Sequence, residues 1–178
     1  GIHKITNSGT ITGGTKAILA GLGIEQIVNR GTITGDIELG GGNDTFTNFQ
    51  KVGTKTIAGK VQGTIDLGEG NDTFNGGAGA ETVSGGDGVD SIKLGGGNDT
   101  YLAQSPTFVA ENETIDGGTG IDTYDATGAG AAAAFVNLDT VAHDSALIFS
   151  PSIDGKTAFG FNISGNATPD FKDTITGF

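Results

Sequence analysis

The chain contains no cysteine and no tryptophan, and Lys and Arg together number only 9 of its 178 residues. The lack of cysteine excludes disulfide bonds and zinc sites built from thiolates. Against 21 acidic residues, so few cations leave a formal net charge of −12, which argues against nucleic acid and anionic membrane surfaces as partners. No apolar run approaches the roughly 20 residues that a membrane-spanning helix needs.

Glycine is the residue that the sequence has in excess, with 34 copies, while hydrophobic residues make up 35%. Glycine loses the most backbone freedom on folding, and fixing each residue costs on the order of 1–2 kcal/mol. An ordinary globular core is therefore hard to build, and we expect folding to depend on a bound ion. Gly1 opens no recognisable signal peptide, which fits a C-terminal export signal or a piece of a longer chain, and we expect a longer chain.

Four nine-residue segments follow one another without a gap between residues 67 and 102. Each has glycine at its second and fourth positions, an acid at its sixth and an apolar residue at its eighth: LGEGNDTFN (67–75), GGAGAETVS (76–84), GGDGVDSIK (85–93) and LGGGNDTYL (94–102). Single copies stand before and after them, LGGGNDTFT (39–47) and GGTGIDTYD (117–125). Self-similarity at so short a period predicts a stacked architecture in which each unit contacts only its neighbours.

Each segment predicts a glycine turn followed by a very short strand whose apolar side chain points inward. Two segments make one coil, so residues 18 apart stack, Asp72 with Asp90 and Glu81 with Asp99. Carboxylates at strand spacing, about 4.8 Å, repel each other unless a positive charge lies between them. Lys93 is the only cation between residues 66 and 125, so a hard divalent ion such as calcium, which prefers carboxylate and carbonyl oxygens, is the simplest solution.

These segments resemble the nonapeptide GGxGxDxUx of the RTX (repeats-in-toxin, hemolysin-type) calcium-binding proteins, over residues 63–126 or about a third of the chain. The resemblance implies a parallel β-roll in which Ca²⁺ ions bridge neighbouring turns, in a bacterial protein exported by type I secretion. Toxins, proteases, lipases, alginate epimerases and adhesins carry such repeats. The sequence departs from the pattern where Leu39, Leu67 and Leu94 replace the first glycine. Glu81 replaces the usual aspartate, which weakens the expectation of a site with Asp99.

The candidate calcium ligands are the acids at the sixth position together with glycines and asparagines of the turns. They are Asp72, Asp90, Asp99, Glu81, Asp44, Asp122, Gly68, Gly70, Asn71, Gly77, Gly79, Gly86, Gly88, Gly95, Gly97 and Asn98. The alternative is that the aspartates are solvated turn residues that cap their own backbone. The contiguous repeat favours calcium for Asp72, Asp90 and Asp99 more strongly than for Asp44 and Asp122, which lie in single copies.

Other polar residues receive no such role. We interpret Asp66, Glu69 and Asp87 as surface charge, because they lie outside the sixth position. His3 and His143 stand far apart in the sequence, without the spacing of a metal site or a catalytic triad.

A related repeat occupies the first sixty residues, where ITNSGTITGG (5–14) recurs as IVNRGTITGD (27–36), 22 residues later. Its alternating pattern predicts strands, and its length suits one rung of a parallel β-helix, similar to rungs of bacterial surface and autotransporter-type proteins. The GxGND turns recur at spacings of 28 and 27, which leaves open a second register with Asp44, Asp72 and Asp99 on one edge. We prefer the 18-residue coil for 67–102 and larger coils before it.

After Asp125 the sequence changes to alternating, more apolar segments, FVNLDTV (135–141), SALIFS (145–150), KTAFGFNIS (156–164) and DTITGF (173–178). They predict an antiparallel or mixed sheet that caps the open end of the stack. The predicted fold is thus all-β, a right-handed parallel β-helix or β-roll solenoid with a C-terminal β-strand cap. We expect rungs over 1–62, a calcium-binding β-roll over 63–126 and the cap over 127–178.

The leading functional hypothesis is a calcium-binding structural module of a secreted or cell-surface bacterial protein, which folds on Ca²⁺ binding after type I secretion. The alternative is a calcium-dependent adhesin domain that binds a glycan or a surface. A polysaccharide-active β-helix enzyme is disfavoured, because one arginine, few lysines and two scattered histidines offer no cationic or general-base cluster. The sequence also contains no nucleophile elbow and no HExxH.

Overall fold

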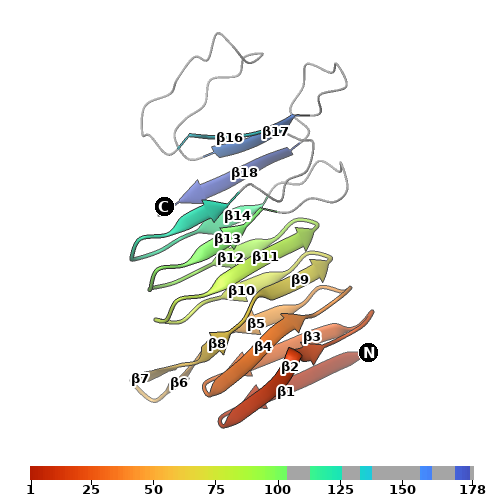
Figure 1. Ribbon diagram of the computed structural model, residues 1–178, viewed down its shortest axis with the longest axis vertical. Helices are drawn as coiled ribbons and strands as arrows, with labels where there is room; N and C mark the ends of the chain where they lie inside the picture. Colours follow the sequence, from red (N-terminus) through yellow and green to blue (C-terminus); the bar gives the residue numbers. More distant parts are fainter. Residues whose placement is uncertain (104–112, 126–132, 138–156, 162–170, 177–178) are drawn as a thin grey trace.

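A computed structural model describes residues 1–103 and 113–125, and the backbone of three later strands at 133–137, 157–161 and 171–176. The regular secondary structure within these ranges consists of β-strands alone. The described residues accordingly include no helix long and apolar enough to cross a membrane. The strands wind in flattened turns that stack from the N-terminal end towards the C-terminal end (Figure 1). The predicted all-β parallel solenoid is confirmed.

Each turn of the solenoid contributes a strand to each of two sheets. The first sheet has the order β1 (Ile2–Asn7), β3 (Ile24–Asn29), β5 (Thr45–Thr47), β10 (Thr73–Asn75), β12 (Ser91–Lys93), β14 (Thr114–Asp116), β18 (Phe171–Thr176), β17 (Thr157–Phe161) and β16 (Ala133–Asn137). The second has the order β15 (Thr123–Asp125), β13 (Thr100–Leu102), β11 (Thr82–Asp87), β9 (Ile65–Glu69), β4 (Thr32–Glu38) and β2 (Thr10–Leu19), with β8 (Lys60–Gln62) also paired to β4. All pairs up to β15 in these two sheets are parallel.

The register between turns settles the length of each coil. Between β10 and β12, and again between β11 and β13, paired residues are 18 apart, as we preferred for residues 67–102. In the earlier turns, paired residues are 22 apart between β1 and β3, 19 apart between β3 and β5 and 28 apart between β5 and β10. The alternative register holds for its 28-residue step, because Asp44 and Asp72 do stack. Its 27-residue step is wrong, because Asp99 precedes β13 in the second sheet whereas Asp72 precedes β10 in the first.

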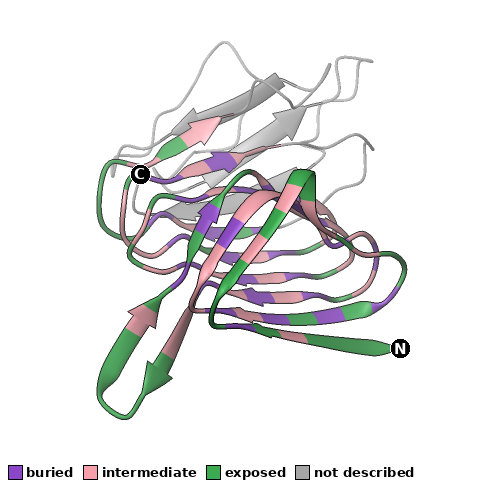
Figure 2. Ribbon diagram, turned by 60° about the horizontal axis from the view of Figure 1, so that its bottom comes forward, coloured by how far each residue is buried: buried purple, intermediate pink, exposed green. Residues whose placement is uncertain are grey.

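The largest of these turns carries an insertion. An antiparallel hairpin of β6 (Phe49–Val52) and β7 (Lys55–Ala58) leaves the stack and projects from its side (Figures 1 and 2). Its strands are mostly exposed, so the hairpin adds length to the turn without breaking the stack. This insertion accounts for the 28-residue spacing that made the second register plausible in the sequence.

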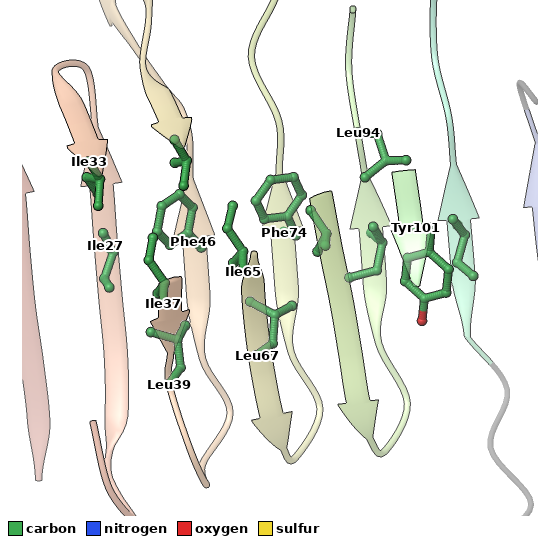
Figure 3. Close-up of a cluster of buried hydrophobic side chains, with 14 residues drawn as sticks. Ile27, Ile33, Ile37, Leu39, Phe46, Ile65, Leu67, Phe74, Leu94 and Tyr101 are labelled. Atoms are coloured by element: carbon green, nitrogen blue, oxygen red, sulfur yellow. The ribbon is translucent and has the colours of Figure 1, made fainter. Parts of the chain in front are cut away.

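The core is a row of apolar side chains repeated at each turn between the two sheets (Figure 3). Phe74, Val83, Ile92 and Tyr101, the eighth-position residues, are at most 1% exposed, as their inward position predicts. The Phe46 and Phe74 rings stack with centroids 5.8 Å apart. Burying each such side chain contributes about 1.5–3 kcal/mol.

The leucines that replace the first glycine of the nonapeptide have a packing role. Leu39, Leu67 and Leu94 are fully buried and belong to the same core cluster. The substitution therefore adds apolar burial to turns that are otherwise rich in glycine and polar residues.

The glycine at the fourth position of the nonapeptide has no alternative residue in the turns that contain Gly42 and Gly70. The φ angles of Gly42 and Gly70 are 143° and 135°, in the region that side chains disfavour. A Cβ at Gly70 would lie 1.6 Å from the carbonyl oxygen of Gly42, and one at Gly42 would lie 1.6 Å from that of Gly23. Successive turns therefore approach through glycine alone, which brings the following residues of each turn close to one another.

The strands after residue 126 continue the first sheet. β18 pairs with β14 in parallel, while β17 pairs antiparallel with β18 and β16 pairs antiparallel with β17. This mixed sheet at the end of the stack agrees with three of the predicted segments, and the fourth, 145–150, lies outside the described residues (Figure 1). The division into three domains stays a prediction.

An asparagine ladder, made of Asn7, Asn29 and Asn48, joins the first three turns at the ends of β1, β3 and β5. The Nδ2 group of Asn7 donates to Asn29 Oδ1 at 2.9 Å, and Asn29 Nδ2 donates to Asn48 Oδ1 at 2.7 Å. The Oδ1 atoms of Asn7 and Asn29 also accept from the amides of Gly9 and Gly31 at 3.1 Å each. The Asn-x-Gly of the 22-residue repeat thus encodes a neutral, hydrogen-bonded edge.

Replacing Asn29 tests this ladder. The Asn29→Ala variant takes the donor from the buried Asn48 Oδ1 and one of two acceptors from Asn7 Nδ2, which keeps only the Thr32 carbonyl oxygen at 3.2 Å. We therefore expect the free energy of unfolding to fall by about 1–3 kcal/mol. Urea denaturation in saturating calcium measures the loss, with Thr56→Ala on the exposed β7 strand as control. Equal stabilities of the two variants would show that the ladder contributes nothing.

Candidate metal centre

A first acidic column, made of Glu25, Asp44, Asp72 and Asp90, lies where successive strands of the first sheet begin. The backbone amide of Glu25 donates to Asp44 Oδ1 at 2.8 Å. The amide of Asp44 donates to Asp72 Oδ1 at 2.6 Å, and that of Asp72 donates to Asp90 Oδ1 at 2.8 Å. Each aspartate is therefore fixed by the turn before it, and the carboxylates form a continuous file.

A second acidic column, made of Glu81, Asp99 and Asp122, lies where β11, β13 and β15 of the second sheet begin. The amide of Glu81 donates to Asp99 Oδ1 at 2.7 Å, and that of Asp99 donates to Asp122 Oδ1 at 2.9 Å. Asn48 Nδ2 donates to Glu81 Oε1 at 2.8 Å. The asparagine ladder thus leads directly into this column, with amides in the early turns and carboxylates in the later ones.

The acids of both columns are buried, apart from the half-buried Asp122, and each of them retains an oxygen without a partner. Six of them, all but Asp122, are 1–3% exposed. Within the described residues, no lysine or arginine forms an ion pair with any column residue. A buried carboxylate oxygen without a hydrogen bond or a cation is costly. The unpartnered atoms are Glu25 Oε2, Asp44 Oδ2, Asp72 Oδ2, Asp90 Oδ2, Glu81 Oε2, Asp99 Oδ2 and Asp122 Oδ2.

Burial shifts the protonation of these groups. It raises the pKa of Asp72 to about 7, and the hydrogen bond from the Asp44 amide only partly opposes this effect. Burial likewise raises the pKa of Glu81 to about 7 and that of Asp90 to about 6. The pKa values of Asp44 and Asp99 are also raised, again mainly by burial. Without a cation, the negative charge on these carboxylates disfavours the folded state at neutral pH.

The donor set fits calcium. Calcium takes six to eight oxygen ligands in a flexible shell, and the columns offer carboxylate oxygens and the carbonyls of glycine turns, without thiolates. No three acidic or histidine side chains converge on one point within the described residues. A cation would therefore take carboxylate oxygens from two adjacent turns, such as Asp72 and Asp90, and complete its shell with backbone carbonyls and water. Each ion so held would offset the charge of two carboxylates.

The structure divides the predicted acidic ligands between the two columns. Asp44, Asp72 and Asp90 lie in the first, and Glu81, Asp99 and Asp122 in the second. Glu81 occupies its expected place despite the longer side chain, with Oε2 unpartnered. Direct ligation by these residues stays a prediction.

The predicted turn ligands comprise glycines, which differ in the sign of φ, and asparagines, whose side chains hydrogen-bond to the adjacent turn. Gly77 and Gly79 lack the positive φ of the other predicted glycines, which are Gly68, Gly70, Gly86, Gly88, Gly95 and Gly97. Asn71 and Asn98 make an outer set of contacts, because their Oδ1 atoms accept from the amides of Val89 and Ile121 at 3.0 and 3.2 Å. These asparagines support the turns beside the columns.

Three acids, Asp66, Asp87 and Glu25, differ from what the sequence predicts. Glu69 is exposed, as surface charge predicts, but Asp66 is half-buried next to Glu38, and burial raises its pKa. Asp87 has a buried Oδ1 without a partner. Sequence reasoning also missed Glu25 as a member of the first column. Its signal was present as two glycines, an acid and an apolar residue in the order of the nonapeptide, at Gly21, Gly23, Glu25 and Ile27.

The pH dependence of folding without calcium follows from the raised pKa values. Because Asp72, Glu81 and Asp90 bind protons more tightly folded than unfolded, stability should fall as the pH rises from about 4 towards 7, where the folded groups lose those protons. We expect the β-sheet signal of the calcium-free chain in far-UV circular dichroism to be greater at pH 5 than at pH 8.

The matched control is the Asp72→Asn/Asp90→Asn double variant, which removes two of the titrating carboxylates and should show a weaker dependence on pH. A β-sheet signal that grows between pH 5 and pH 8 in calcium-free buffer would contradict this account of the columns.

Comparison with known proteins agrees with this geometry. A family model of the RTX calcium-binding nonapeptide repeat, in four copies, matches residues 66–101. No curated protein and no solved structure matches the chain. The resemblance of the early rungs to autotransporter-type proteins therefore stays a prediction. RTX nonapeptide repeats bind calcium ions, and here they form consecutive turns of a parallel β-solenoid. Residues 66–101 are thus an RTX calcium-binding β-roll, and the chain contains a calcium-binding structural module.

Proposed function

We propose that this chain is a calcium-triggered folding module of a bacterial protein that works outside the cell, as part of its secreted or surface-exposed portion. The observation that supports this most is the pair of buried carboxylate columns whose second oxygens have no partner in the described residues. Such columns are unfavourable without a cation and favourable with one. Folding is therefore coupled to the calcium concentration around the chain.

The ligands we propose are paired acids of adjacent turns. In the first column these are Asp44 with Asp72 and Asp72 with Asp90, and in the second Glu81 with Asp99 and Asp99 with Asp122. Backbone carbonyls of the glycine turns between them complete the shells. The hydrogen bond from each preceding amide holds one oxygen of an aspartate and leaves the other for the ion.

The coupling between calcium binding and folding suits a protein that is exported before it folds. At the low calcium concentration inside a cell, a net charge of −12 and many glycines favour an extended chain that can pass through a narrow export channel. Extracellular calcium modules bind with dissociation constants of about 10⁻⁴–10⁻³ M, between the two compartments. Bound calcium then offsets the stacked charges and the turns close upon each other. Type I secretion fits this sequence of events, and a structural role fits better than a catalytic one.

A calcium titration of the chain of 178 residues tests the proposal. We expect far-UV circular dichroism to report a transition to β-structure with a midpoint of about 10⁻⁴–10⁻³ M calcium. The Asp72→Asn/Asp90→Asn variant should shift the midpoint upward by about tenfold or more, because a site between these residues loses both charged ligands.

The control is Glu69→Gln, which removes a charge from an exposed side chain in the same turn as Asp72 and should leave the midpoint unchanged. A wild-type spectrum that is the same in chelator and in millimolar calcium would overturn the proposal. So would equal midpoints for the double variant and the control.

A further inference from the structure

Residues 20–28, AGLGIEQIV, form a nonapeptide turn that neither the repeat pattern nor the family match includes. In the parallel register of β3 and β5, Gln26 faces Thr45 and Ile27 faces Phe46, so Glu25 stands at the position of Asp44. The glycines correspond too: a Cβ at Gly40 or Gly42 would meet the carbonyl oxygen of Gly21 or Gly23, at 2.4 and 1.6 Å. This turn therefore stacks in register on the nonapeptide turn at 39–47, with alanine, glutamate and the lack of a positive φ at Gly21 and Gly23 as departures.

The Glu25 side chain is buried and aimed into the column. Glu25 is 2% exposed and Asp44 is 1% exposed. The buried atoms Glu25 Oε2 and Asp44 Oδ2 both lack a partner. Glu25 Oε1 lies only 2.8 Å from the place of a Cβ on Gly23, so the carboxylate folds back over the glycine turn and uses the space that a side chain would fill. Two buried oxygens of adjacent turns thus remain without hydrogen bonds.

His3 holds the other oxygen of Glu25. It stands opposite Glu25 in the register of β1 and β3, and its Nδ1 lies 2.6 Å from Glu25 Oε1. The His3 side chain is 66% exposed and carries at most one positive charge against two buried carboxylates. The Coulombic effect of Glu25 adds to burial in raising the pKa of Asp44. His3 therefore positions Glu25 and leaves at least one negative charge of the Glu25 and Asp44 pair uncompensated.

We propose that Glu25 Oε2 and Asp44 Oδ2 hold a further calcium ion, outside the residues that the family model matches. This inference rests on the proposed function, because it assigns to the first column one more site of the same chemistry. The opposite edge of the same turns carries the neutral Asn7–Asn29–Asn48 ladder, whose amides bond to each other. The two edges therefore differ: the cation sites of the first column reach β3, whereas those of the second begin at Glu81.

Isothermal titration calorimetry of the chain tests the site. Glu25→Gln should bind one calcium ion fewer than the wild type, while Glu69→Gln should keep the full number. Circular dichroism in saturating calcium checks that the Glu25→Gln variant folds. An unchanged number of bound ions in a folded Glu25→Gln variant would overturn the inference.

A second measurement needs no variant. Crystals of the wild-type chain grown with terbium, a calcium substitute with strong anomalous scattering, should show a peak between Glu25 and Asp44 as well as one between Asp72 and Asp90. A peak at Asp72 and Asp90 without one at Glu25 and Asp44 would overturn this inference alone. The absence of both peaks would instead contradict the proposed function.

Discussion

The stability of the solenoid depends on how the repulsion between stacked carboxylates is offset. The backbone register places these carboxylates next to one another in successive turns. Parallel pairing at 18 residues a turn places Asp72 beside Asp90 and Glu81 beside Asp99, and burial removes the water that would screen them. The apolar row between the sheets gains about 1.5–3 kcal/mol for each buried side chain but brings these charges together as it forms. Packing and electrostatics therefore oppose each other until a divalent ion joins the columns, which makes calcium a part of the folding equilibrium.

The two edges of the early turns show two solutions to the same problem of stacking polar groups. Where Asn7, Asn29 and Asn48 stack, each amide supplies both a donor and an acceptor, so the edge is satisfied without an ion. A carboxylate supplies only acceptors, so a file of acids needs a donor or a cation from elsewhere. The contact of Asn48 with Glu81 marks the change from one solution to the other. The early turns thus offer an ion-independent edge on which the calcium-dependent turns can stack.

Much of this architecture could be predicted from the sequence, because the repeat carries backbone, packing and charge information together. The inward position of Phe74 and Ile92, the pairing of Asp72 with Asp90 and the all-β parallel fold all followed from the nine-residue period. The membership of Glu25 did not, because Ala20 and the glutamate hide the motif until β3 and β5 are seen in register. The partial burial of Asp66 also escaped, since it depends on neighbours in adjacent turns rather than on the local pattern. The hairpin at β6 and β7 lengthens one turn to 28 residues, and this real spacing made the unrelated 27-residue spacing of Asp72 and Asp99 resemble a second such turn.

The most direct test of the account is the dependence of the unfolding free energy on free calcium, measured by urea denaturation at pH 8 over a series of calcium concentrations. The slope against the logarithm of concentration gives the number of ions taken up on folding. We expect stability to rise with a slope corresponding to more than one ion per chain. A stability independent of calcium would contradict it.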